Sequence, residues 1–229
     1  MAVLPRPRHG RPLYAASNAK AAMPNLTSPP ARLEAFSDGV IAVIITIMVL
    51  ELHVPHQTGL TGLRPVLPTL AVYALSFAFT AIYWINHHHL VHRTQETDQA
   101  ILYANLFFLF CLSLLPFFTS YLLEMKLDSF SVALYAASMV VTGFSFMLLR
   151  LSIVWRLRRN GSLEQEDQTA IYKHWISLGL YLIAIPLAFY HSYWALGIIA
   201  LVFVVWIYPT AKVHHGHDAA NSAHLDNQP

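Results

Sequence analysis

Histidines that could bind a metal gather at one place in the chain. They are His87, His88, His89 and His92, and histidine is the commonest metal ligand among side chains. His88 and His92 are four residues apart, so on a helix they share one face and could hold one metal ion together. The pattern is compatible with a membrane metalloenzyme of the di-iron desaturase or hydroxylase type.

A complete di-iron site needs further histidine groups, and this sequence offers few. His174 and the tail residues His214, His215, His217 and His224 would have to supply them, and no H-x-x-H-H motif is present. We therefore predict no metal and no other cofactor. The histidine-box enzyme is kept as a remote alternative.

A second group of polar residues lies directly before a long apolar run. Arg32, Phe36, Ser37 and Asp38 form the pattern R-x-x-x-F-S-D. A carboxylate at a membrane boundary is costly to desolvate unless it is paired. We expect Asp38 to be paired with the Arg32 guanidinium or with an N–H group of a histidine at the end of the next helix.

The apolar run itself carries a stripe at helical spacing. Val43, Thr46, Ile47 and Leu50 fall on one face of a helix, and Glu51 ends near the same face. The carboxylate of the F-S-D motif points away from that face, toward neighbouring helices. Such a stripe is either a packing seam between helices or the lining of a pore, and the spacing alone leaves both open.

The composition indicates the class of protein that positions these groups. Hydrophobic residues make up 56% of the 229 residues and charged residues only 11%, with a mean hydropathy of +0.48. A soluble domain has about 25% charged residues. The chain therefore belongs in a lipid bilayer, and the lone Cys111, within an apolar segment, can form no intrachain disulfide.

The apolar runs predict an all-α membrane protein with six transmembrane helices. They span about residues 32–52, 66–86, 101–123, 130–155, 171–190 and 192–208. The segment 53–68 is rich in Pro and Gly and is predicted to be a loop on the outer side, and residues 156–167 are predicted to be a solvated turn on the inner side.

The basic residues set the expected orientation, because Lys and Arg are enriched in cytoplasmic loops. In the six-helix arrangement only Arg64 and Lys126 lie outside. The other 12 of the 14 basic residues lie inside: Arg6, Arg8, Arg11, Lys20, Arg32, Arg93, Arg150, Arg156, Arg158, Arg159, Lys173 and Lys212. Both termini are therefore predicted to be cytoplasmic.

The domain organisation follows from the same pattern. Residues 1–31 are predicted to be a disordered, basic and Pro-rich cytoplasmic tail, 32–210 a six-helix domain, and 211–229 a disordered, His-rich cytoplasmic tail. We expect the lipid bilayer to be a partner and nucleic acid not to be one.

The R-x-x-x-F-S-D motif before a spanning helix resembles the transmembrane protein 175 family, the lysosomal potassium channel and its bacterial relatives, over residues 32–210. The resemblance implies a single-repeat homotetramer in a prokaryotic plasma membrane, with the first helix lining a central pore. It also implies a potassium-preferring cation channel, with permeant monovalent cations as partners, that lacks the T-V-G-Y-G filter; this sequence has no such motif.

The resemblance further assigns roles to individual residues. Val43, Ile47 and Leu50 would form apolar rings that narrow the pore, with Thr46 hydroxyls beside them and Glu51 at the outer mouth. The innermost ring is a valine here, smaller than the leucine or isoleucine expected in the family. A structural polar network would join three helices, and its members would be Arg32, Phe36, Ser37, Asp38, Trp84, His87, His88 and Asn105.

An ion-coupled secondary transporter is the alternative reading. Coupling usually needs an ionisable residue near the midplane of the bilayer, or helices broken at matching positions of two repeats. Pro116 and Pro186 fall inside predicted helices, but the sequence shows no internal repeat that relates them.

Overall fold

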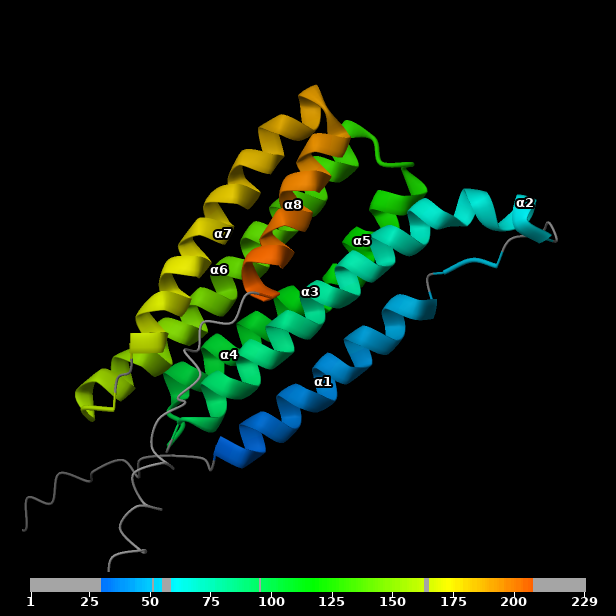
Figure 1. Ribbon diagram of the computed structural model, residues 1–229. Coiled ribbons are helices and arrows are strands. Elements are labelled where there is room, and N and C mark those ends of the chain that lie inside the picture. Colours follow the sequence, from blue (N-terminus) through cyan, green and yellow to red (C-terminus); the bar gives the residue numbers. More distant parts are fainter. Residues whose placement is uncertain (1–29, 51, 55–58, 95, 163–164, 208–229) are drawn as a thin grey trace, which may run out of the picture.

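The computed structural model describes residues 30–50, 52–54, 59–94, 96–162 and 165–207. These residues form a bundle of helices (Figure 1). The elements are α1 Pro30–Leu50, α2 Gly59–Leu63, the 3-10 helix η1 Arg64–Val66, α3 Leu67–His92, α4 Gln99–Ser113, α5 Leu115–Glu124, α6 Ser129–Arg159, α7 Gln165–Tyr190 and α8 Ser192–Ile207.

The long helices match the predicted spans. Five segments are long and apolar enough to cross a bilayer, and α4 with α5 counts as one of them. The remaining helix, α8, is apolar but has only 16 residues. Helices dominate because a bilayer offers no partner for backbone N–H and C=O groups, so each segment must pair its own. The predicted all-α fold with six helices is therefore confirmed.

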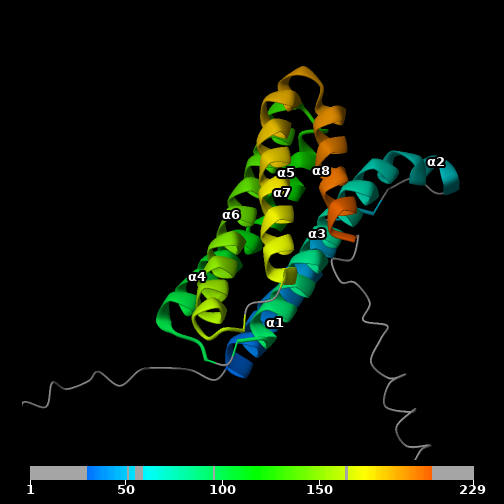
Figure 2. The same cartoon turned by 60° about the vertical axis from the view of Figure 1, so that its left-hand side comes forward.

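The helices are arranged so that α1 lies at one edge of the bundle and α7 at the other (Figure 1). α1 packs on α3 and α4, whereas α6, α7 and α8 pack on one another (Figure 2). α6 is the most buried of the long helices, and small residues along it let its neighbours approach. At Gly143 an added Cβ would lie 3.0 Å from the Leu178 side chain, which shows how closely α6 and α7 meet.

Several helix ends differ from the predicted ones. α3 continues six residues past the predicted end and includes all four clustered histidines. α7 begins at Gln165, so the predicted inner turn at residues 156–167 is mostly helical. The predicted outer loop also contains the short helices α2 and η1. Polar residues at a membrane boundary do not end a helix, because water and lipid headgroups solvate their side chains there. The hydropathy pattern therefore indicates the extent of the bilayer core and not the end of the helix.

The third predicted helix is two helices, α4 and α5, which meet at Leu114. Pro116 lies in the first turn of α5 and has no N–H to donate to the Leu112 carbonyl. The Leu114 N–H instead turns back to the carbonyls of Cys111 and Leu112. The predicted helix over residues 101–123 is therefore one spanning segment with a break at Leu114, and the missing donor of the proline is the reason for the break.

Two aspartates cap the helices that follow loops. Asp98 accepts a hydrogen bond from the Ile101 N–H at 2.9 Å at the start of α4. Asp128 accepts one from the Ser131 N–H at 2.9 Å at the start of α6. Hydrogen bonding from Ser131 holds the pKa of the Asp128 carboxyl below its usual range. Both helices thus begin with a satisfied N-terminus.

Candidate functional site: helix α1 and its polar anchor

Helix α1 has one face buried against the rest of the chain. The buried side chains recur at helical spacing and are Leu33, Ser37, Ile41, Ile44 and Met48, each at most 6% exposed. They contact α3 and α4, the helices next to α1. The rotational position of α1 is therefore fixed by its own subunit.

The predicted stripe of Val43, Thr46, Ile47 and Leu50 lies on the exposed part of α1. Val43 is 55% exposed, Ile47 42% and Leu50 79%. The Thr46 hydroxyl donates to the Val43 carbonyl at 2.8 Å, so its proton is used within the helix and its oxygen lone pairs remain available. Val49, on another part of the helix surface, is also 46% exposed, so exposure alone does not single out the stripe.

One buried amide links α1 to α3 and α4. The Asn105 side-chain N–H₂ donates to the Ser37 hydroxyl oxygen at 3.0 Å, and Asn105 Oδ1 lies 2.7 Å from His87 Nε2. Since Asn105 Oδ1 can only accept, His87 Nε2 carries the proton. The Ser37 hydroxyl in turn donates to the Leu33 carbonyl at 2.8 Å. Ser37, His87 and Asn105 are all fully buried, so this chain of hydrogen bonds is closed to solvent.

A second, more exposed set of contacts lies beside the first. The Trp84 indole N–H donates to Asp38 Oδ1 at 2.8 Å, and His88 Nδ1 lies 2.8 Å from Glu34 Oε1. The Trp84 and His88 rings are stacked with their centroids 5.9 Å apart. Glu34 and Asp38 are one helical turn apart, as are Trp84 and His88, so two matched pairs join α1 to α3.

The structure therefore brings together Ser37, Asp38, Trp84, His87, His88 and Asn105 of the predicted network. It does not bring in the other two members. Arg32 is exposed and makes no ion pair with another described residue, so the indole and not the guanidinium serves Asp38. Phe36 is 54% exposed at the surface of α1. Glu51 and the tail histidines lie outside the described residues.

Glu34 was not predicted to belong to the site. A glutamate in the first turns of a helix usually faces solvent, and Glu34 is not part of the R-x-x-x-F-S-D pattern. The available signal was its spacing of four residues from Asp38, which places both carboxylates on one face. In the part of the chain that the structure describes, no cluster of three or more His, Cys, Asp or Glu residues could hold a metal ion.

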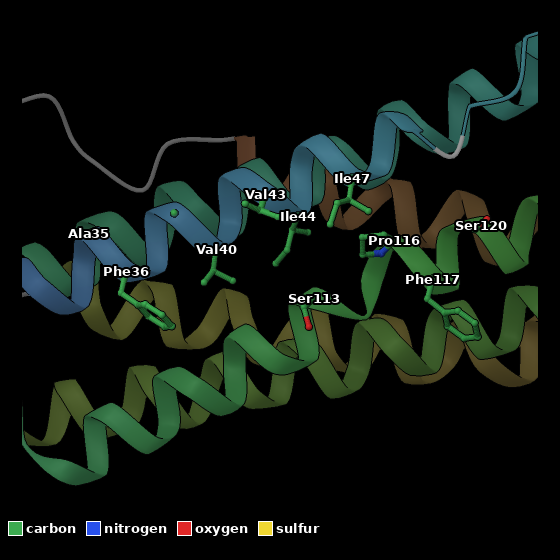
Figure 3. A pocket seen from close by; sticks show the side chains of 11 residues that line it. Ala35, Phe36, Val40, Val43, Ile44, Ile47, Ser113, Pro116, Phe117 and Ser120 are labelled. Atoms are coloured by element: carbon green, nitrogen blue, oxygen red, sulfur yellow. The ribbon is translucent and has the colours of Figure 1, made fainter.

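A wide groove runs along α1 where it faces the α4–α5 break (Figure 3). Its volume is about 840 Å³. Its lining is largely apolar and comprises Ala35, Phe36, Gly39, Val40, Val43, Ile44, Ile47, Ser113, Pro116, Phe117 and Ser120. Two stripe residues, Val43 and Ile47, thus border a surface that this chain alone leaves uncovered.

Comparison with known proteins gives consistent matches. The family model described as endosomal/lysosomal potassium channel TMEM175 matches residues 32–116. A potassium channel of Chryseobacterium sp. (strain P1-3) is 37% identical over 182 residues, which cover 80% of this chain and 94% of the relative. A potassium channel of Chamaesiphon minutus is 31% identical, with 79% and 93% covered.

A solved structure is also similar. It is the crystal structure of a lysosomal potassium-selective channel TMEM175 homolog from Chamaesiphon minutus, with a TM-score of 0.70 and 27% sequence identity. The match covers 80% of this chain and 98% of that chain.

Proposed function

Because this chain belongs to the TMEM175 family, we propose that it is a potassium-preferring cation channel whose pore is lined by α1 in a homotetramer. The family is one of ion channels, so the histidine-box enzyme is set aside. The bacterial relatives that it matches support a prokaryotic plasma membrane as its location. The distribution of Lys and Arg supports both termini in the cytoplasm.

The observation that carries the proposal is the two-sidedness of α1. One face is fixed to α3 and α4 by apolar contacts and the Asn105 hydrogen bonds, and the stripe of Val43, Thr46, Ile47 and Leu50 is left exposed. Around a four-fold axis, four copies of this stripe would face one another. The adjoining groove would then be covered by a neighbouring subunit.

The proposed constriction would act through its side chains. Three apolar rings, each made of four side chains at close approach, leave a passage that water occupies poorly, and such a passage closes by dewetting. An ion that crosses it loses part of its hydration shell. The oxygen of Thr46, whose proton is used by the Val43 carbonyl, can replace some of that shell, more readily for weakly hydrated potassium than for sodium.

The test is ion flux into liposomes that contain the purified protein. Val43→Asn is expected to raise potassium and sodium flux, because a polar ring admits water. Thr46→Ala is expected to lower the potassium preference with less effect on closure. Val49→Asn is the matched control, since Val49 is similarly exposed but lies off the stripe.

The outcomes separate the proposal from its alternatives. No increase for Val43→Asn in correctly assembled protein, or an equal increase for Val49→Asn, would contradict the pore assignment. Flux that requires a second ion gradient would instead favour the secondary transporter. A conductance without such coupling supports the channel.

A further inference from the structure

A small cavity lies inside the bundle, away from α1, where α3, α6, α7 and α8 meet. Its volume is about 20 Å³. Its lining includes the polar residues Tyr83, Asn86, His174 and Ser177. A cavity of about 10–15 Å³ is enough for one water molecule, provided that the water finds two to four polar partners.

His174, one of the residues that line this cavity, has an unused hydrogen-bonding atom. Its side chain is 2% exposed, and Nε2 lies 2.7 Å from the Gly143 carbonyl oxygen. A carbonyl only accepts, so Nε2 carries a proton. Nδ1 has no hydrogen-bond partner among the described residues.

Burial inside the bundle disfavours the charged form of the imidazole, and a nearby arginine adds to this effect. The Phe146 ring contacts both groups: its centroid lies 5.6 Å from that of His174 and 5.3 Å from the guanidinium carbon of Arg150. A second positive charge so near a buried arginine is unfavourable. With Nε2 protonated and the ring neutral, Nδ1 is an acceptor, and a buried acceptor without a donor destabilises the fold.

A water in the cavity needs a second polar partner besides His174, and the other polar residues of the lining differ in whether their hydrogen-bonding groups are already used. The Ser177 hydroxyl donates to the Lys173 carbonyl at 2.9 Å and accepts from the Trp206 indole at 2.9 Å. The Asn86 amide donates to the Ile82 carbonyl at 2.9 Å. The Tyr83 hydroxyl, from α3, makes no hydrogen bond to another described residue and lies beside Gly143, 3.5 Å from where a Cβ would be, so it can donate to a guest molecule.

We propose that this cavity is a binding site for one ordered water molecule, which donates to His174 Nδ1 and accepts from the Tyr83 hydroxyl. The water joins α3, the helix that holds α1, to α7 in the other half of the bundle. The proposal does not depend on the channel function.

Direct detection uses solid-state NMR on the full-length protein in lipid bilayers, labelled with ¹⁵N-histidine. The His174 signals are identified by their loss in His174→Gln. The expected result is a neutral ring with the proton on Nε2 and a magnetisation transfer from water to Nδ1. A proton on Nδ1, or no transfer from water, would overturn the proposal.

A thermal-stability cycle tests the bridge independently. His174→Gln retains a donor near the Gly143 carbonyl and removes the Nδ1 acceptor, whereas Tyr83→Phe removes only the hydroxyl. Each is expected to lower Tm by about 2–4 °C, the shift for roughly 1 kcal/mol in a chain of this size. The double variant should lose no more than the larger single loss, because either change removes the same water.

The control pairs His174→Gln with Tyr135→Phe. The Tyr135 hydroxyl lies 2.8 Å from Ser76 Oγ in a separate buried network, so its loss should add to that of His174. Additive losses for Tyr83 and His174 would show that no shared molecule joins them.

Gly143→Ala is expected to weaken the water-to-Nδ1 transfer, since its methyl group would enter the space beside the Tyr83 hydroxyl.

Discussion

At the scale of single residues, the Asn105 amide holds α1 to two other helices. It donates to Ser37 on α1 and accepts from His87 on α3, and all three side chains are fully buried. An apolar residue at this position would leave the buried His87 N–H without an acceptor, whereas the Ser37 hydroxyl would keep its hydrogen bond to the Leu33 carbonyl. The single amide of Asn105 therefore connects three helices, α1, α3 and α4, by hydrogen bonds.

Asn105→Leu is expected to destabilise the protein by about 1–3 kcal/mol, because the buried His87 N–H is left without an acceptor. The measurement is the thermal stability of the detergent-solubilised protein, followed by size-exclusion chromatography. Arg32→Ala is the control, because Arg32 is exposed and has no ion pair among the described residues. Equal losses for the two variants would argue against the amide as the anchor.

The residues of the site were only partly predictable from the sequence. Trp84, His87, His88 and Asn105 were proposed through a family resemblance, because their hydrogen-bond partners are distant in the chain. Asp38 was expected to pair with a guanidinium or a histidine, and an indole N–H serves it instead. Electrostatic reasoning favours charged partners and overlooks the neutral donor that packing brings within reach.

At the scale of helices, the break between α4 and α5 is the main departure from the regular bundle. Pro116→Ala restores an N–H that can bond to the Leu112 carbonyl, four residues before it. We expect α4 and α5 to straighten into one helix. Spin labels at the exposed positions Tyr103 and Glu124 should then lie farther apart in electron-resonance distance measurements.

The straightening experiment needs two precautions. The native thiol Cys111 is replaced by alanine, and labelled chains are diluted with unlabelled ones so that distances within one chain dominate. Leu114→Ala is the control, since it changes the residue at the break and keeps the proline. An unchanged distance in Pro116→Ala would mean that packing, and not the missing donor, bends the segment.

Helix existence was predictable and helix ends were not. The apolar runs marked each spanning segment, because bilayer thickness imposes a minimum apolar length. His87 and His92 continue α3 beyond its apolar run, and Gln165 starts α7 before its own. Pro116 was visible in the sequence, but many prolines in membrane helices only bend them, and its position alone did not predict a break.

At the scale of the whole molecule, Glu51 is expected to act as part of a ring of four carboxylates at the outer mouth. Glu51→Gln should lower cation conductance at low salt more than at high salt, because the field of exposed charges is screened over about 8–10 Å at physiological ionic strength. Single-channel recordings at two salt concentrations measure this. Glu124→Gln, at the exposed end of α5, is the control.

An equal fractional loss at both salt concentrations would remove the electrostatic role of Glu51. An equal salt-dependent loss in Glu124→Gln would show that the field belongs to the whole outer surface and not to the pore mouth.

Assembly is the feature that is hardest to predict from the exposed side chains of a single chain. Apolar side chains face both lipid and neighbouring subunits, so exposed Val49 and Phe110 look like exposed Val43 when a subunit is viewed alone. In a bilayer no hydrophobic driving force distinguishes the two surroundings. The fold could be predicted from hydropathy, whereas the proposed tetramer rests on the resemblance to the family.

The anchor of α1 also sets an order of events during synthesis. Ser37 meets its partner Asn105 68 residues later in the chain, and Asp38 meets Trp84 46 residues later. At 5–20 residues per second, the first gap corresponds to roughly 3–14 s of translation. Until its own partner is made, each side chain lacks that contact, although the Ser37 hydroxyl can already donate to the Leu33 carbonyl. Because both residues lie near the N-terminal end of α1, headgroups and water can solvate their side chains until the ribosome has synthesised the helices that carry their partners.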